Sequence, residues 1–141
     1  MLTIDKALHV FHTTGARVTP QRMMIVQVLV GNQTHPTVED IFMRVRESYP
    51  TISLATVYHT LSLLAQHGLI LELRGIKDRV HCDPNTRPHA HAYCEKCDAV
   101  FDLPIETQPM WTGNMLAGFT ISRVDIMAYG ECADCKTHMN Q

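Results

Sequence analysis

Two short runs of residues carry the side chains best suited to metal chemistry in this chain of 141 residues. Residues 89–102 hold an H-x-H pair, a C-x-x-C pair and an aspartate, and a second C-x-x-C pair follows at residues 132–135. Imidazoles, thiolates and carboxylates are the usual protein ligands of zinc and other transition metals. The spacing therefore predicts two metal sites that share the stretch 89–102.

The two C-x-x-C pairs together supply four thiolates, from Cys94, Cys97, Cys132 and Cys135. Four thiolates form the ligand set of a tetrahedral structural zinc site. Because 34 residues separate the pairs, such a site would clamp the first strand of this region to the end of the chain. Two redox-active dithiols are the alternative, but neither pair lies in a β-α-β context typical of thioredoxins.

A second group combines imidazole and carboxylate side chains. His89 and His91 lie on one face of a predicted strand, because the side chains of a strand alternate between its faces. Asp83 and Asp102 lie at strand edges on either side of this pair, and His35 lies in a polar loop far upstream. Three imidazoles and two carboxylates suit Fe(II), Mn(II), Ni(II) or Zn(II). Sequence spacing does not by itself bring His35 to the other four residues.

The fifth cysteine, Cys82, belongs to neither C-x-x-C pair. A lone cysteine is most often a small buried residue. Its position beside Asp83 also allows it to be a further metal ligand, so both interpretations stay open at this level.

Composition and the N-terminal sequence indicate a cytoplasmic globular protein. Apolar residues make up 45% of the chain, which is enough to bury a core. No apolar run approaches the roughly 20 residues that span a membrane, and the N-terminus lacks the charged start and apolar core of a signal peptide. Five cysteines in a cytoplasmic protein favour metal binding over disulfides.

Charge is distributed unevenly along the chain, whose net charge is −2. Residues 1–82 carry eight Lys and Arg against six Asp and Glu, whereas residues 83–141 carry four against eight. The more basic N-terminal part is compatible with DNA binding. A bound divalent metal would offset part of the acidity of the rest.

The first 82 residues predict a winged helix-turn-helix domain. Helix start patterns occur at Thr19 before Pro20, at Thr37 with Asp40 three residues later, and at Ser53. Predicted helices cover residues 4–13, 20–30, 37–49 and 53–66, and a β-hairpin covers residues 70–82. The spacer between the last two helices is short enough for a helix-turn-helix, and a following hairpin would form the wing. A small helical domain with no ligand is the alternative.

The last predicted helix offers a polar face to DNA. Its buried stripe is predicted to consist of Leu54, Val57, Leu61 and Leu64, at helical spacing. Tyrosine rings and threonine methyls can lie against thymine, histidine and serine can bond base edges, and arginines can contact phosphates. The predicted DNA-binding residues are Arg17, Arg22, Ser53, Thr56, Tyr58 and His59.

The remainder of the chain predicts a small α/β domain. A turn-rich hinge at residues 83–88 separates a DNA-binding domain, 1–82, from a second domain, 89–141. Strands are predicted at 89–94, 99–103 and 119–128, with a helix at about 106–116. Such a small core needs a metal or a partner chain to stabilise it.

Several motifs in a fixed order give the chain a resemblance to the ferric uptake regulator family over nearly its whole length. They are Arg-Val-Thr-Pro-Gln-Arg at 17–22, His-Pro-Thr at 35–37, Ala-Thr-Val-Tyr at 55–58, Asp-Pro-Asn-Thr at 83–86, His-Ala-His at 89–91, Asp102 and both C-x-x-C pairs. The resemblance implies a homodimeric, metal-dependent transcriptional repressor that binds a double-stranded operator. The implied fold is α+β, with an N-terminal winged helix and a small C-terminal α/β dimerisation domain.

The resemblance also assigns both metal groups. It implies structural Zn²⁺ on the four paired cysteines and a regulatory Fe²⁺ or Mn²⁺, with Zn²⁺ as a further possibility, on His35, Asp83, His89, His91 and Asp102. The regulatory ligands come from both domains, so the metal would fix the orientation of one domain to the other and stabilise the state that binds DNA.

The two aspartates among these ligands resemble the peroxide-sensing branch, because iron-sensing members more often carry Glu there. In that branch bound Fe(II) reacts with peroxide and oxidises ligand histidines, which here match His35 and His89. Iron sensing is the alternative, and Cys82 keeps zinc sensing open.

Two positions depart from the family pattern. His59 follows the recognition-helix tyrosine where members often have Arg or Asn, which leaves the operator preference open. Residues at a further metal site of some members are here Pro88, Ala90 and Val124, which cannot bind metal, so two metals per chain are expected.

Two other classes of protein compete with this prediction. A hydrolase could use the H-x-H pair, but it has no evident general base apart from the ligands, and five ligands leave little room for substrate. A purely structural zinc protein would not need His89. We therefore expect a regulator rather than an enzyme.

Overall fold

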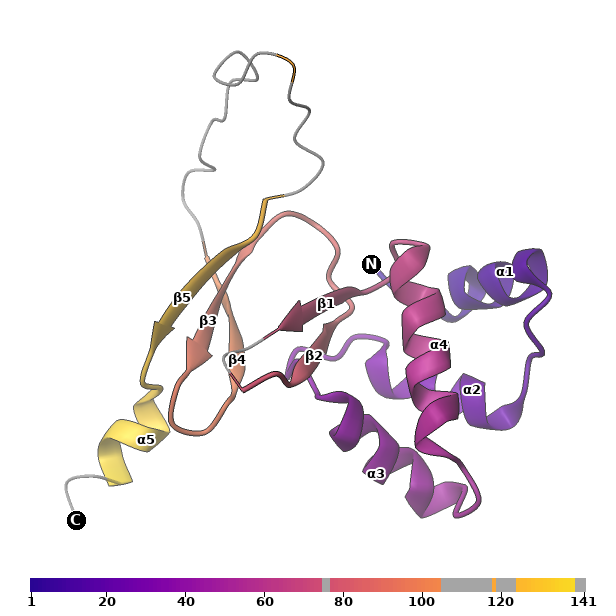
Figure 1. Ribbon diagram of the computed structural model, residues 1–141, viewed down its shortest axis with the longest axis horizontal. Coiled ribbons are helices and arrows are strands. Elements are labelled where there is room, and N and C mark those ends of the chain that lie inside the picture. The colour runs from indigo at the N-terminus through magenta and orange to yellow at the C-terminus, as the bar shows by residue number, and fades with distance from the viewer. Residues whose placement is uncertain (75–76, 105–117, 119–123, 139–141) are drawn as a thin grey trace. The chain divides into compact units, whose positions relative to one another are not determined.

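The computed structural model describes residues 1–74, 77–104, 118 and 124–138 of the chain (Figure 1). The chain divides into two compact units, residues 1–87 and residues 88–141. The described residues of the first unit form four helices and a two-stranded sheet, and those of the second form a three-stranded sheet and a short helix. This mixture confirms the predicted α+β class. Among the described helices, none has both the length and the apolar character needed to cross a membrane.

Four capped helices form most of the first unit. They are α1 (Ile4–Thr14), α2 (Pro20–Leu29), α3 (Val38–Ser48) and α4 (Leu54–Gln66). The starts of α2, α3 and α4 confirm the predicted caps, because the side chains of Thr19, Thr37 and Ser53 accept the backbone N–H three residues on. Each cap satisfies a donor that the first turn of a helix leaves unpaired.

The start of α3 is held by a reciprocal capping box. The Thr37 backbone N–H donates to Asp40 Oδ2 at 2.9 Å, and the Asp40 N–H donates to the Thr37 hydroxyl at 3.1 Å. Partial burial opposes ionisation of Asp40, but hydrogen bonds from Thr37 outweigh it and lower the pKa of this carboxyl. The box fixes the point where the loop carrying His35 enters α3.

The four helices pack around one apolar core, and its composition corrects one prediction. The buried residues of α4 are Val57, Thr60, Leu61 and Leu64, whereas Leu54 is 39% exposed. The stripe therefore begins one turn later than predicted. Thr60 can replace an apolar residue because its hydroxyl donates to the Thr56 carbonyl at 2.7 Å, which satisfies the polar group inside the helix.

A β-hairpin follows the helices, as predicted. Strands β1 (Leu71–Arg74) and β2 (Val80–Asp83) pair antiparallel, with Leu73 opposite His81. Part of the connecting turn, residues 75–76, lies outside the described residues. β2 extends one residue beyond the predicted hairpin and so includes Asp83. Four helices followed by this hairpin form a winged-helix arrangement.

The second unit is built on three strands in the order β4-β3-β5. They are β3 (Ala90–Cys94), β4 (Val100–Leu103) and β5 (Ile126–Gly130). β3 pairs antiparallel with β4 and parallel with β5. The central position of β3 gives it a hydrogen-bonded neighbour on each edge (Figure 1).

The C-terminal part of this unit differs from the predictions at one strand, and it contains one helix that was not predicted. The predicted strand at 119–128 is corrected, because the described strand runs from Ile126 to Gly130 and residues 119–123 lie outside the described residues. The predicted helix at 106–116 also lies outside them. Helix α5 (Ala133–His138) has six residues, too few to show a helical pattern of apolar residues.

The corrected stripe of α4 gives a matched pair of variants. Leu64→Ala is expected to lower the free energy of unfolding by about 2–5 kcal/mol, because it opens a cavity at a fully buried position. Leu54→Ala is expected to change it by only about 0.5 kcal/mol, because Leu54 is largely exposed. Urea unfolding followed by circular dichroism on the zinc-loaded protein measures both. Equal losses from the two variants would contradict the corrected stripe.

Candidate metal centres

The parallel pairing of β3 with β5 brings the two C-x-x-C pairs together. The carboxyl ends of parallel strands meet at one edge of a sheet, and here Cys94 lies opposite Gly130. The Glu95 N–H donates to the Gly130 carbonyl at 2.8 Å, which ties the turns that follow the two strands. Cys97 lies in the turn after β3, Cys132 immediately before α5, and Cys135 within α5. The long separation in sequence is thus closed by one strand pair.

The spacing of the four sulfur atoms fits a tetrahedral zinc ion. Cys94 Sγ lies 3.8 Å from Cys135 Sγ, and Cys97 Sγ lies 3.8 Å from Cys132 Sγ. All four lie within 4.8 Å of one another. Zn–S bonds of about 2.3 Å in a tetrahedron place the sulfurs about 3.8 Å apart, whereas a disulfide requires about 2.0 Å. The geometry favours zinc over two redox dithiols.

The charges of the four cysteine thiolates also favour a bound cation. The Cys132 N–H donates to Cys94 Sγ at 3.3 Å and is the largest cause that lowers the pKa of Cys94 to about 6. The neighbouring Cys132 sulfur, by contrast, is the largest cause that raises the pKa of Cys135 to about 12. Four sulfurs this close cannot all be thiolates unless a cation compensates their charge, which is what Zn²⁺ does.

Three predicted regulatory residues of the second unit converge on one face of its sheet. His91 is directly opposite Asp102 in the β3–β4 pairing, so the two side chains leave the sheet on the same side. His89 precedes His91 by two residues and has its Nε2 3.0 Å from Asp102 Oδ1, while His91 Nε2 lies 3.9 Å from the same oxygen. Cys94, three residues from His91, leaves β3 on the opposite face.

The other two predicted regulatory residues meet within the first unit. His35 Nε2 lies 3.9 Å from Asp83 Oδ1, and both side chains are about 2% exposed or less. Asp83 Oδ1 also accepts the Asn85 N–H at 2.7 Å, which orients the carboxylate. His35 has a φ of 49°, a left-handed conformation that costs a non-glycine residue on the order of 1–3 kcal/mol. The surrounding contacts must hold it there.

His81 supplies one of these contacts and was not among the predicted site residues. Its Nδ1 lies 2.8 Å from the His35 carbonyl oxygen, and both residues are buried. The alternation of side chains in β2 places His81 on the same face as Asp83. The sequence signal that could have identified His81 is its position two residues before Asp83, which places both side chains on one face of a strand.

Cys82 lies between these two residues but faces the other way. It leaves β2 on the face opposite to His81 and Asp83 and is completely buried in the apolar core of the helices. Burial, together with Glu72, Glu39 and Asp83, raises the pKa of this thiol to about 12. Its environment is that of a small buried residue rather than of a metal ligand.

Four of the six predicted DNA-binding residues line one hollow of about 520 Å³ in the first unit. Arg17 contributes to it from the turn between α1 and α2, Arg22 from the first turn of α2, and Thr56 and His59 from α4. The Arg22 guanidinium donates to the Arg17 carbonyl at 3.1 Å and lies 5.9 Å from the centre of the Phe11 ring. Arg22 thus braces the turn that presents Arg17.

The remaining two predicted DNA-binding residues lie outside this hollow. Ser53 caps α4, and its hydroxyl lies 2.9 Å from that of Thr56. Tyr58 is 45% exposed, and its hydroxyl donates to Glu39 at 3.3 Å. Partial burial and then Glu39 raise its pKa. DNA contact by any of the six residues stays a prediction.

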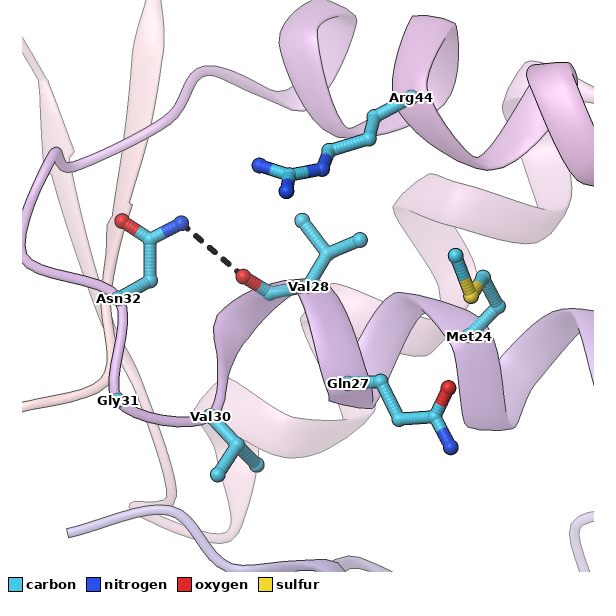
Figure 2. Close-up of a pocket in the computed structure, with 7 residues that line it drawn as sticks. All are labelled: Met24, Gln27, Val28, Val30, Gly31, Asn32 and Arg44. Atoms are coloured by element: carbon cyan, nitrogen blue, oxygen red, sulfur yellow. Dashed lines mark hydrogen bonds between the residues drawn. The ribbon is translucent and has the colours of Figure 1, made fainter.

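A second hollow of the first unit contains none of the predicted site residues. It occupies about 310 Å³ between the end of α2 and α3, and the Asn32 amide donates to the Val28 carbonyl at its edge (Figure 2). Figure 2 shows Arg44 extending from α3 beside Val28. The chemistry predicted from the sequence is thus concentrated elsewhere.

A winged-helix unit and a sheet carrying a tetrathiolate and an imidazole–carboxylate group define the class of this protein as a metal-binding regulator of transcription. Comparison with known proteins makes the class specific. The family model described as the ferric uptake regulator family matches residues 13–129. The peroxide operon regulator of Bacillus subtilis (strain 168) is 33% identical over 139 residues, which cover 97% of this chain and 96% of that protein.

Solved structures agree in fold. The ferric uptake regulator Fur of Helicobacter pylori superposes with a TM-score of 0.74 at 20% identity, covering 95% of this chain and 94% of that one. The Campylobacter jejuni peroxide stress regulator gives 0.67 at 26% identity, covering 91% and 98%. The chain belongs to the ferric uptake regulator family. Its members are transcriptional regulators rather than enzymes, and this chain is a metal-dependent transcriptional repressor.

Removal of one thiolate tests the tetrathiolate site. Cys94→Ser is expected to abolish zinc retention and unfold the second unit, because structural zinc contributes on the order of 10 kcal/mol to such small domains. Cys82→Ala is the matched control and should keep a full zinc complement, because Cys82 is buried away from the cluster. Elemental analysis of the purified proteins gives zinc per chain. Zinc loss from the control, or its retention in Cys94→Ser, would contradict the assignment.

Proposed function

We propose that this chain is a peroxide-responsive repressor whose operator binding requires Fe²⁺ or Mn²⁺ at a regulatory site made of imidazoles and carboxylates. The observation that carries the proposal is the convergence of His89 and His91 on Asp102, with Nε2–Oδ1 distances of 3.0 and 3.9 Å. Nitrogen and oxygen ligands of this kind suit divalent iron and manganese. Likeness to the Bacillus subtilis peroxide operon regulator along 97% of the chain supports the response to peroxide.

The proposal takes the ligands of both units as one site. His35 and Asp83 of the first unit would supply two ligands, which are too few to hold a six-coordinate ion. Three more ligands would come from the second unit, from His89, His91 and Asp102. Five ligands together would leave one coordination position open for peroxide. A metal bound by both units would select one arrangement of them and so favour the state that binds DNA.

Fe(II) held by these residues would supply electrons for cleavage of the peroxide O–O bond. In the overall reaction one peroxide oxygen would join a ring carbon of His35 or His89, and the other would leave as water. The imidazole would lose two electrons and peroxide would gain two, so the overall reaction requires no net change in the oxidation state of the iron. The oxidised ring is a poor ligand, because its nitrogen lone pairs are less available. Loss of this ligand would weaken metal binding and so relieve repression.

Family regulators act on DNA as dimers, and we propose a homodimer on a double-stranded operator in the cytoplasm. The face of the second unit's sheet opposite to the histidines supports this proposal. Ala92 lies opposite Phe101 and Ala128 on that face, and Phe101 and Leu103 are 44% and 37% exposed. Exposed apolar side chains on one face of a sheet suit a second copy of the same surface.

The number of metals per chain is part of the proposal. The Helicobacter pylori structure is described as having three functional metal binding sites. Here Pro88, Ala90 and Val124 occupy positions that the family resemblance assigns to a further site, and their side chains carry no metal-binding atoms. We propose two metals per chain, one zinc and one exchangeable ion.

Loss of a regulatory imidazole is expected to abolish the metal response. His35→Ala and His89→Ala should each remove Mn²⁺-dependent operator binding and keep the thiolate zinc, because the two groups use different residues. His9→Ala, an exposed residue of α1, is the control. Gel-shift titration with operator DNA at increasing Mn²⁺ measures the response. Wild-type operator affinity in both ligand variants would refute the regulatory assignment.

Exposure to peroxide separates peroxide sensing from iron or zinc sensing. Protein loaded with Fe²⁺ and treated with hydrogen peroxide is expected to gain one oxygen atom on His35 or His89, because these imidazoles would lie beside the reacting iron. Peptide mass spectrometry locates the addition. Protein loaded with Mn²⁺ should stay unmodified, because Mn(II) is not readily oxidised by peroxide. Intact histidines in the iron-loaded sample would instead favour an iron-responsive repressor.

A further inference from the structure

The loop that carries His35 is held to strand β2 at three consecutive residues. The His35 carbonyl oxygen lies 2.8 Å from His81 Nδ1, and the Pro36 carbonyl accepts the Cys82 N–H at 2.9 Å. Thr37 forms an antiparallel bridge with His81. Two of these contacts use backbone groups that any residue of β2 would supply. The contact to His35 alone depends on a particular side chain.

The direction of the His81 hydrogen bond follows from its partner. A carbonyl oxygen only accepts, so Nδ1 of His81 must carry the proton and donate it. His81 is 4% exposed and His35 is 2% exposed, so water does not compete effectively for either group. The bond therefore fixes both the His81 tautomer and the direction of the His35 carbonyl.

Fixing that carbonyl also fixes the imidazole of His35. Its φ of 49° is a left-handed value that a residue with a side chain adopts only when neighbouring contacts hold it. Rotation about the His35 N–Cα bond moves the carbonyl and the side chain together, so a change of φ would break the bond to His81 and turn the imidazole away from Asp83, whose Oδ1 now lies 3.9 Å from His35 Nε2. Two side chains of β2 therefore position His35. Asp83 lies beside its imidazole ring, and His81 holds its backbone carbonyl.

We propose that His81 is a positioning residue for the regulatory metal, which acts by keeping His35 in its left-handed, ligand-ready conformation. The proposal rests on the proposed function, because it takes His35 and Asp83 as ligands of that metal. His81 itself need not touch the ion. Groups that orient metal ligands in this way typically change metal affinity by 10- to 100-fold when they are removed.

Two substitutions separate the hydrogen bond from the bulk of the ring. His81→Asn keeps a donor, because the Asn amide nitrogen stands at the same place along the side chain as Nδ1. His81→Leu keeps a similar volume without a donor. His67→Leu is a matched control, because His67 Nδ1 also contacts a backbone carbonyl, that of Leu63 at 2.9 Å, at the C-terminal cap of α4, where no predicted ligand lies.

Titration of the zinc-loaded full-length proteins with Mn²⁺, read by competition with a metal-indicator dye, tests the proposal. His81→Leu is expected to weaken Mn²⁺ binding by about 10- to 100-fold, with zinc content unchanged. The Mn²⁺ affinity of His81→Asn should lie closer to that of the wild type than the affinity of His81→Leu does. The Mn²⁺ affinity of His67→Leu should equal that of the wild type. A second readout needs no manganese: ¹⁵N NMR of the zinc-only wild type should show His81 protonated at Nδ1.

The outcomes distinguish this proposal from the function on which it rests. Wild-type Mn²⁺ affinity in His81→Leu, while His35→Ala has lost binding, overturns the positioning role and leaves the proposed regulatory site standing. Wild-type affinity in His35→Ala overturns the regulatory site itself. Ile41→Val destabilises the same helical core without touching the bond, so an equal loss of affinity in that variant would show that stability alone explains the effect and would overturn the positioning role.

Discussion

Pairing of β3 on both of its edges is the constraint on which the metal chemistry of the second unit depends. The parallel partner β5 ends beside Cys94 and returns the distant second C-x-x-C pair to the first. The antiparallel partner β4 places Asp102 directly across from His91. Because side chains alternate along a strand, thiolates and imidazoles leave β3 on opposite faces only three residues apart. A slip of one residue in the register would exchange the two faces and disrupt both groups.

The two kinds of ligand group differ in how the fold holds them. Cys94 ends β3, but the other three cysteines come from connecting segments and a six-residue helix that have little apolar core of their own, so zinc binding and local folding would be one event. The histidines and aspartates lie on elements that hydrogen bonds and packing already fix. His35 is held by β2, and His91 and Asp102 are held by their strand pair. A group fixed without its metal can lose and regain the metal without unfolding, which is the property a regulatory site requires.

Local sequence patterns predicted the helices well. The features that these patterns did not predict depend on contacts between residues far apart in the sequence. Thr19, Thr37 and Ser53 cap helices because their hydroxyls act within one turn, and such contacts can be inferred from neighbouring residues. Leu54 was wrongly predicted to be buried, because periodicity gives the phase of a stripe without showing where the covering helices end. The parallel β3–β5 pair and the approach of His81 to His35 join residues more than 30 positions apart, and no spacing rule specifies them. The two C-x-x-C pairs predicted the cysteine group from spacing alone, whereas the family resemblance was needed to join His35 to the other predicted regulatory ligands.

The placement of all five cysteines bears on a sensor that would be oxidised at histidine. Thiolates react with peroxide far more readily than imidazoles do, so an exposed free thiolate would consume the oxidant first. Four cysteines form the tetrathiolate cluster, where a redox-inert zinc ion would share their charge and lower their nucleophilicity. The fifth, Cys82, is completely buried, and its pKa is raised to about 12, so it stays a protonated thiol at neutral pH. If zinc fills the tetrathiolate cluster, each of the five thiols is either bound to zinc or buried, and an oxidant generated at the proposed regulatory metal would meet the ligand imidazoles first. Zinc in this chain would therefore stabilise the fold and also direct oxidation to histidine.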